Sequence, residues 1–411
     1  MTSSHALAIA AALFAAVSFA ADNIDTRVQR VLDATPLIDG HNDLPWALDH
    51  HYGDTARGID ITDLGPATPH PMHTDLDRMR RGGVGAQFWS VFVSNTLAPS
   101  EAISHTLEQI DLVRVMTARN ADGMEMAYSA TDVRRIHADG RIAALLGVEG
   151  GHQIGGSLAV LRQFHALGVR YMTLTHARTI DWADSATDDP RHGGLTPFGH
   201  EVIREMNRIG MMVDLSHVSP QVMEQALDTT AAPVIFSHSG ARGVVDHSRN
   251  VPDDILRRLP ANGGVVMVVF YPGYVSADYN EWVAARAAEQ ARLSSPPFSG
   301  LYIGQPERAR KALAAWDATH PKPEVTLLDV IAHIEHVRDV AGIDHVGLGS
   351  DFDGVGDLPI DLAGVDAYPA LLAALMRRGW SDEEVAKLSG ENLLRVMEQT
   401  RAVASGGQPR R

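Results

Sequence analysis

Histidine and carboxylate side chains recur at the ends of short apolar runs along the chain. His41 and Asp43 end the first such run, and Glu149, His217 and His238 end later ones. Imidazole and carboxylate groups are ligands of zinc and other first-row divalent ions. Because the chain has no cysteine, a metal would have to be held by histidine, aspartate and glutamate. These five residues therefore predict a metal centre.

The pattern suits two neighbouring ions. His41 and Asp43 are two residues apart, which in a strand places both side chains on the same side. If Glu149 is shared, His41 and Asp43 complete one set of three ligands, and His217 and His238 complete the other. Two ions about 3.5–4 Å apart can share a hydroxide and polarise a carbonyl. Three protein ligands for each ion leave room for that water and for a substrate.

Two other runs also end in residues that can do chemistry, His176 and Asp351. Asp351 and His217 each have a plainer explanation. Asp351 and Asp353, in the sequence SDFDG, could form a turn, and His217 alone could be a buried structural histidine. Six runs that end only in metal-binding or acid–base residues nevertheless favour an active site. The other histidines of interest are expected to be structural or on the surface: His152, His165, His192, His200, His247 and His333.

The elements that would bring these residues together are eight apolar runs separated by helical stretches. Continuous apolar runs are typical of parallel strands buried on both faces. Eight strand–helix repeats predict a (β/α)8 barrel, in which all strands point their carboxyl ends at one face. A doubly wound open sheet is the alternative, but no glycine-rich nucleotide motif follows a strand. The runs are Pro36–Asp43, Val84–Val93, Ile142–Gly150, Val169–His176, Met211–His217, Pro233–His238, Gly264–Tyr271 and His345–Asp351.

The connection from Pro272 to Pro323 has about 50 residues, more than a barrel crossover needs, and predicts a helical insertion after strand 7. Leu362–Arg377 and Ser381–Thr400 are expected to be closing helices. Because no linker divides the chain, residues 22–411 are expected to form a single domain.

Composition excludes one class of partner and suggests a location. The 411-residue chain has a formal net charge of −16, which excludes a protein that binds nucleic acid through its phosphates. Ala6–Ala20 is nearly all apolar but shorter than the roughly 20 residues that span a bilayer. Residues 1–21 are therefore expected to be a signal peptide, and the protein to be periplasmic or secreted, without a stable membrane anchor. A buried amino-terminal helix or an uncleaved anchor remains the alternative.

Six stretches of the sequence together resemble the membrane (renal) dipeptidase family, zinc peptidases with a (β/α)8 barrel in the wider amidohydrolase superfamily. They occur in the family's order from residue 38 to residue 355, and GENLLRV at Gly390–Val396 is similar to the family's closing motif. The stretches are IDGHNDLPW, GVEGGH, LTHARTIDWADS, VDLSHVS, FSHSGARGVVDHSRNVPDD and GLGSDFDGV.

The resemblance implies that the two ions are zinc. His41 and Asp43 would hold one zinc, and His217 and His238 would hold the other. Glu149 and a hydroxide would bridge them, two ions in each subunit. These are the two ligand sets already inferred from spacing.

The resemblance also implies how a substrate is bound and cleaved. Asp351 would be the general acid and base, and His176 would contact the substrate near the scissile carbonyl. Arg249 would bind the terminal carboxylate of a dipeptide. The residues alone did not predict Arg249, although a planar guanidinium suits a carboxylate.

The sequence departs from the family pattern in four places. Without cysteine, the intersubunit disulfide of the mammalian enzymes is impossible, and the lipid-anchor tail is absent. An Asn expected soon after His176 is missing, and Thr179 and Asp181 occupy that stretch. The closing motif has Glu391 where the family has glycine. None of these changes touches a predicted metal ligand.

We therefore expect an exported zinc dipeptidase that uses the bridging hydroxide as its nucleophile, with a homodimer possible. Another amidohydrolase reaction, such as deamination or hydrolysis of an ester or lactone, is the first alternative. It would not need Arg249 as a carboxylate clamp. An exported metal- or solute-binding protein without activity is the second, and it would not need Asp351.

Overall fold

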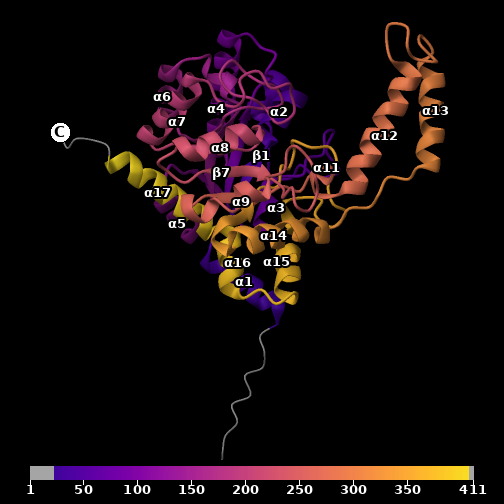
Figure 1. The fold of residues 1–411 in the computed structure, drawn as a ribbon. Helices are drawn as coiled ribbons and strands as arrows, with labels where there is room; N and C mark the ends of the chain where they lie inside the picture. The colour runs from indigo at the N-terminus through magenta and orange to yellow at the C-terminus, as the bar shows by residue number, and fades with distance from the viewer. Residues whose placement is uncertain (1–22, 407–411) are drawn as a thin grey trace, which may run out of the picture.

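The computed structural model describes residues 23–406, which form a closed barrel of eight parallel strands. The strands follow the order β2-β1-β9-β8-β7-β6-β5-β4, and pairing of β2 with β4 closes the sheet. Helices lie around the barrel between successive strands (Figure 1). The predicted (β/α)8 barrel is confirmed, and the open sheet is wrong. The predicted signal peptide lies outside the described residues.

Each of the eight predicted runs coincides with one barrel strand, and only β7 extends past its run, by Ser239. The strands are almost wholly buried, because side chains on one face fill the barrel and those on the other pack against helices. A short additional strand, β3 (Met124–Met126), pairs with the start of β4 and was not predicted. The barrel strands are β1 (Leu37–Asn42), β2 (Val84–Phe92), β4 (Ile142–Glu149), β5 (Val169–Thr173), β6 (Met212–Asp214), β7 (Ile235–Ser239), β8 (Val265–Val268) and β9 (Val346–Leu348).

Seventeen α-helices lie within the described residues, and several are only one turn long. They are α1 (Ile24–Ala34), α2 (Leu44–Tyr52), α3 (Leu76–Arg81), α4 (Pro99–Arg119), α5 (Ala130–Ala138), α6 (Leu158–Ala166), α7 (Pro197–Ile209), α8 (Pro220–Thr229), α9 (Asp253–Leu256), α10 (Leu259–Asn262), α11 (Pro272–Val275), α12 (Ala277–Ser294), α13 (Pro306–Thr319), α14 (Leu327–Ala341), α15 (Tyr368–Arg377), α16 (Asp382–Ala386) and α17 (Asn392–Gly406).

Local chemistry sets several helix ends. The Ser129 side chain accepts the Asp132 N–H at the start of α5, and Ser219 caps α8, which has Pro220 in its first turn. Serine is a preferred residue at the helix cap, and proline is well tolerated in the first turn. The expected helix from Leu362 begins only at Tyr368. A 3-10 turn over Val365–Ala367 precedes it.

The predicted helical insertion follows β8, the seventh barrel strand, and is confirmed. Helices α12 and α13 form an arm that projects from the barrel (Figure 1). Arg286 and Asp317 join the two helices through hydrogen bonds of 2.8 and 3.0 Å. At the base, Tyr279 donates a hydrogen bond to Asp357 in the loop after β9, and Lys322 lies 2.7 Å from the same carboxylate.

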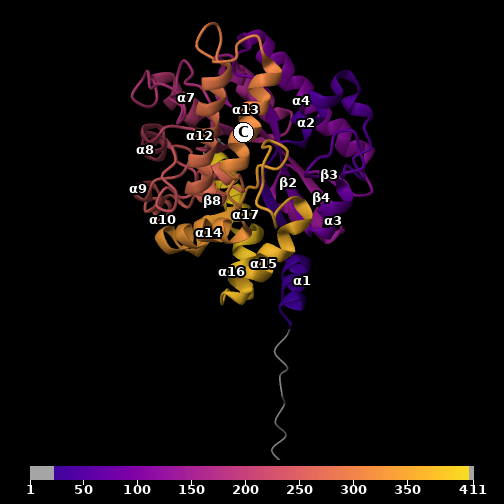
Figure 2. The same cartoon turned by 90° about the vertical axis from the view of Figure 1, so that its right-hand side faces the viewer.

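The first and last parts of the described chain pack together. Helix α1 lies beside α15 and α16 (Figure 2). Arg27 Nε donates to Asp382 Oδ1 at 2.7 Å across this contact. Among residues 23–406, no helix combines the length and the apolar character needed to cross a membrane.

Candidate metal centre and active site

The predicted site residues meet at the carboxyl ends of the barrel strands. His41 lies in β1, Glu149 is the last residue of β4, and His238 lies in β7. Asp43 follows β1 directly and precedes the first turn of α2. The remaining members follow the ends of β5, β6, β7 and β9: His176, His217, Arg249 and Asp351. The structure brings all eight predicted residues into one region.

Glu149 lies at the centre of this region. Its Oε1 is 3.0 Å from His217 Nε2 and 3.5 Å from His238 Nε2. The same oxygen is 3.6 Å from His41 Nε2. Ser90 Oγ donates to the other oxygen, Oε2, at 3.3 Å. Glu149 thus faces imidazoles from both predicted ligand sets, a position from which one carboxylate can be shared by two ions.

Three groups of buried side chains have ligand atoms within 4.8 Å of one another. Two of these groups are the sets inferred from the sequence. The third includes Asp351, which therefore reaches the same space as the predicted ligands. The groups are His41–Asp43–Glu149, Glu149–His217–His238 and His41–His238–Asp351.

Backbone strain is concentrated here. Within residues 23–406, only three residues other than glycine have a left-handed backbone: His217 (φ 67°), Asp351 (φ 67°) and Asp353 (φ 65°). This conformation costs roughly 1–2 kcal/mol for an ordinary side chain and is tolerated better by aspartate. Two of the three are predicted site residues, and such strain gathers at functional sites.

Burial raises the pKa of two of the three carboxylates, whereas His41 outweighs burial and lowers the pKa of the third, Asp43. Burial raises the pKa of Glu149 to about 7, and the neighbouring Asp43 charge acts in the same direction. Burial also raises the pKa of Asp351 well above its usual range, with a further contribution from Asp43. Three buried carboxylates held close together favour a bound cation, which would offset their mutual repulsion.

The imidazoles differ in charge state. Burial lowers the pKa of His217 and of His238 well below the ordinary value, so both are neutral and can offer a lone pair. Burial would also lower the pKa of His41, but Asp43 and Glu149 outweigh it and raise that pKa to about 10. A proton held this firmly between carboxylates marks a place where positive charge is stabilised.

The donor atoms fit a metal such as zinc. His41 Nε2 is buried without a hydrogen-bond partner, although it lies 3.2 Å from Asp43 Oδ2. His217 Nε2 and His238 Nε2 are 2.8 Å apart and converge on the same carboxylate. Imidazole nitrogens and carboxylate oxygens in sets of three are typical zinc ligands.

Arg249 lies beside the cluster with unused hydrogen-bond donors. Its side chain is buried, with 2% of the residue exposed, and Nη2 donates to the His238 carbonyl at 3.3 Å. Nε and Nη1 have no hydrogen-bond partner. Its guanidinium carbon lies 5.2 Å from the centre of the Tyr274 ring. No ion pair involves Arg249 within the described part of the chain, so a buried positive charge is available to an anion.

His176 is the most exposed of the metal-facing residues, with 23% of its side chain accessible. Its ring lies between Phe92 and His217, at centroid distances of 4.7 and 4.4 Å. Nε2 is 3.8 Å from Glu149 Oε1. Burial, followed by the charge of Arg249, lowers the His176 pKa to about 3. The neutral ring can donate one hydrogen bond to a carbonyl oxygen.

Several polar residues that support the cluster were not predicted from the sequence. Asp39 accepts hydrogen bonds from Ser350 N and Ser350 Oγ at 2.9 and 2.7 Å, which ties β1 to the end of β9. Asp214 and Tyr171 are also fully buried beneath the ligands. An aspartate inside an otherwise apolar strand was the signal for Asp39 and Asp214, because a buried charge needs several donors.

The stretch that lacks the expected Asn forms its own hydrogen-bonded loop after β5. Thr179 is buried, its N–H donates to Asp188 Oδ2 at 2.9 Å, and its Oγ1 accepts Ser185 N at 3.1 Å. Ser185 Oγ donates to the His176 carbonyl at 2.7 Å. The loop therefore supports the backbone of His176.

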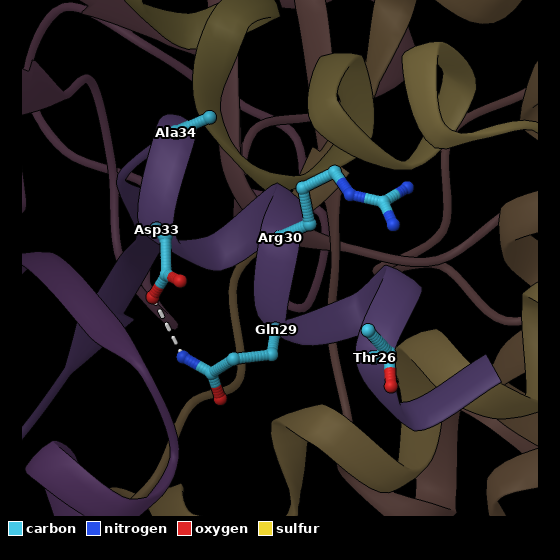
Figure 3. Close-up of a pocket in the computed structure, with 5 residues that line it drawn as sticks. All are labelled: Thr26, Gln29, Arg30, Asp33 and Ala34. Atoms are coloured by element: carbon cyan, nitrogen blue, oxygen red, sulfur yellow. Dashed lines mark hydrogen bonds between the residues drawn. The ribbon is translucent and has the colours of Figure 1, made fainter. Parts of the chain in front are cut away.

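A pocket of about 440 Å³ lies elsewhere, on α1, and is lined by Thr26, Gln29, Arg30, Asp33 and Ala34 (Figure 3). Gln29 Nε2 donates to Asp33 Oδ1 at 2.7 Å within it. Helix α1 leads into the amino end of β1, whereas the polar cluster is at the carboxyl ends. The pocket is therefore not part of the candidate site.

Comparison with protein families gives one match over nearly the whole chain. Residues 25–410 match the family described as membrane dipeptidase, Peptidase family M19. An uncharacterised dipeptidase of Schizosaccharomyces pombe is 40% identical over 385 residues, which cover 90% of this chain and 82% of the relative.

Solved structures share the fold. The probable dipeptidase PvdM from Pseudomonas aeruginosa has a TM-score of 0.78 and 26% identity, covering 93% of this chain and 99% of its own. A metallopeptidase from Rhodobacter sphaeroides has a TM-score of 0.72 and 26% identity, covering 89% and 99%. That structure contains a phosphinate mimic of the dipeptide L-Ala-D-Ala.

Proposed function

This chain belongs to the membrane dipeptidase family, Peptidase family M19, and we propose that it is an exported, zinc-dependent enzyme for dipeptides with a free carboxyl terminus. Its family makes it a peptide-bond hydrolase of the metallo-dipeptidase type. One observation supports this substrate most directly. Arg249 is a buried cation with two unpartnered donor nitrogens beside the metal-binding side chains. Because Arg249 lies beside these side chains, a substrate whose terminal carboxylate it binds must be a short peptide.

Each residue has a defined task in this proposal. Arg249 binds the terminal carboxylate through charge-assisted hydrogen bonds, which orients the peptide bond toward Glu149. His176 is neutral and donates a hydrogen bond to the scissile carbonyl oxygen, where negative charge develops. Asp351 takes a proton from the attacking water and delivers it to the leaving amine.

The ligand sets in this proposal are those described above, with Glu149 shared between two ions. Zinc bound there would lower the pKa of a coordinated water and polarise the scissile carbonyl. The raised pKa of Asp351 suits its task, because burial makes the carboxylate a better proton acceptor than an exposed aspartate.

The proposal also covers location and substrate stereochemistry. The apolar segment Ala6–Ala20 supports export with cleavage near Ala21. A Rhodobacter relative binds a mimic of L-Ala-D-Ala, and we extend this to a D-residue at the carboxyl-terminal position in the present enzyme. Amino-terminal sequencing of exported protein tests the first point. Material that begins at Met1 would contradict it.

A panel of L-L and L-D dipeptides tests the activity, each as free acid and as carboxyl-terminal amide, with zinc added. We expect hydrolysis of free acids and loss of activity on chelation. Equal turnover of acids and amides would remove the clamp and favour another amidohydrolase reaction. Full activity without metal would contradict the proposal as a whole.

A further inference from the structure

We propose that Tyr171 is a positioning residue that determines which ring nitrogen of His41 faces the metal ions. The inference rests on the proposed function, because it concerns the orientation of one ligand of that centre. Tyr171 was not among the predicted site residues, and its side chain is fully buried. Its hydroxyl lies 3.0 Å from His41 Nδ1 and 3.1 Å from the Gly40 carbonyl oxygen.

The two contacts assign the protons. A phenol has one proton to donate, and a carbonyl oxygen can only accept. Both contacts are hydrogen bonds only if Tyr171 donates to the Gly40 carbonyl and accepts the Nδ1–H of His41. When an ion takes the place of the proton on Nε2, the neutral His41 keeps its other proton on Nδ1, and the Nε2 lone pair points at Asp43 and Glu149. This is the tautomer that can bind an ion through Nε2.

The barrel is built to admit this side chain. Tyr171 is on β5 and His41 on β1, two strands that do not pair, so the contact runs through the barrel interior. A Cβ on Gly147 would lie 2.0 Å from the Tyr171 ring, so a larger residue there would displace the tyrosine. The ring also packs against Phe88 at a centroid distance of 5.0 Å. The hydroxyl is therefore held in place by a rigid environment.

A different set of residues orients His238, a ligand of the second ion. The Asp214 carboxylate accepts four hydrogen bonds. Ser216 N and Ser237 N donate to Oδ1 at 3.0 and 2.8 Å. Thr173 Oγ1 and Ser237 Oγ donate to Oδ2 at 2.5 and 2.6 Å. Because Ser237 Oγ donates to the carboxylate, it accepts the Nδ1–H of His238 at 2.9 Å. His238 Nε2 then faces Glu149.

The two supports are neighbours, because the Ser237 side chain also reaches the Tyr171 hydroxyl. Each of them contacts the Nδ1 atom of only one ligand, Tyr171 that of His41 and Ser237 that of His238, which gives the test its contrast. Tyr171→Phe removes one oxygen and keeps the ring that fills the barrel. It should weaken the ion bound by His41 and Asp43 by about 10- to 100-fold, the usual effect of losing such a partner. Ser237→Ala should weaken the ion bound by His217 and His238 instead. Tyr302→Phe, on the projecting arm, is a matched control and should bind both ions as the wild type does.

Metal binding is measured directly, without an activity assay. Zinc per chain is determined after dialysis against a series of zinc buffers, and 113Cd NMR of the cadmium-loaded protein distinguishes the two sites. We expect Tyr171→Phe and Ser237→Ala to perturb different cadmium resonances. Circular dichroism identifies a variant that does not fold, in which case the other variant still decides the assignment for its own site.

Two results would overturn the inference. One is a folded Tyr171→Phe protein with wild-type affinity for both ions. The other is a variant in which both sites weaken equally, which would indicate general loosening of the barrel. A wild-type protein that binds no zinc would instead count against the proposed function itself, so the two failures are distinguishable.

Discussion

The guanidinium of Arg249 lies over the Tyr274 ring, with 5.2 Å between the guanidinium carbon and the ring centre. The ring shields one face of the cation, and a single backbone carbonyl, that of His238, accepts from Nη2. A buried arginine normally has a carboxylate partner, because an unpaired buried charge is costly. Here the partner is missing, which is the property expected of a residue that receives its carboxylate from a substrate.

We therefore predict that Arg249→Ala lowers kcat/KM for free-acid dipeptides by about 10- to 150-fold, the equivalent of a charge-assisted hydrogen bond worth about 1.5–3 kcal/mol. The loss should shrink greatly for carboxyl-terminal amides, which have no carboxylate to bind. Steady-state kinetics on paired acids and amides measures both effects. A similar loss on acids and amides would show that Arg249 acts through structure alone.

A second prediction concerns Glu149, whose Oε1 faces imidazoles from both ligand sets. Glu149→Gln removes the charge shared by the two ions and should lower zinc content for both. Asp43→Asn touches only one set and should spare the other ion. Zinc per chain and the hydrolysis rate, measured together, should rank Glu149→Gln as the more damaging change. Retention of two zinc ions by that variant would contradict a bridging role.

Much of the site could be predicted because the barrel topology turns strand order into spatial proximity. Residues such as His41 and Asp351 are far apart in sequence, yet each ends a buried apolar run, and the carboxyl ends of parallel strands meet at one face. The type of each residue and its place at a strand end were enough to bring the cluster together. The positions of all eight barrel strands followed from the same apolar runs, although strands such as β6 and β9 are shorter than the runs.

The supporting residues could not be predicted in this way. Tyr171 points into the barrel and contacts His41 only because Gly147 leaves space for its ring. That fit depends on the shear and tilt of the closed sheet, which a single sequence does not reveal. Arg249 had no strand position to mark it, since a loop arginine looks like a solvated charge until its burial is known. Family resemblance alone suggested its role.

A third prediction links stability to pH through His333. This histidine of α14 is fully buried, and its Nδ1 accepts the Ala241 N–H at 2.8 Å, which holds the start of the loop that carries Arg249. Burial lowers the His333 pKa to about 4, from 6.5 for an ordinary histidine. The unfolded chain therefore takes up a proton at a higher pH than the folded protein does. The stability that the neutral His333 contributes is present above about pH 6.5 and is lost as the pH falls toward about 4.

His333→Asn preserves an acceptor near the Nδ1 position and cannot titrate in this range. As the pH falls below 6.5, the free energy of unfolding of the wild type should therefore decrease relative to that of the variant, by up to about 1.4 kcal/mol for each pH unit. Urea denaturation of both proteins at pH 7.5 and pH 5 measures this difference. Any pH-independent effect of asparagine on the helix cancels, and an unchanged difference would contradict a neutral, buried His333.

The last prediction separates proton transfer from metal binding at Asp351. This residue has a left-handed backbone, a conformation that asparagine tolerates about as well as aspartate. Asp351→Asn should therefore fold normally, while it removes the group that accepts the proton. Because the five proposed ligands stay in place, zinc content should remain, and kcat should fall by about 10²- to 10⁴-fold.

Asp353→Asn is the matched control for this change. Asp353 is also buried and left-handed, its Oδ1 accepts the His73 N–H at 2.6 Å, and it belongs to none of the three groups of ligand atoms. Loss of its charge should lower kcat far less than the change at Asp351. Zinc analysis of both variants then decides the role of Asp351. Loss of one ion from Asp351→Asn would identify Asp351 as a ligand, which its proximity to His41 and His238 allows. Equal losses of rate in the two variants would contradict the assignment of Asp351 as the general acid and base.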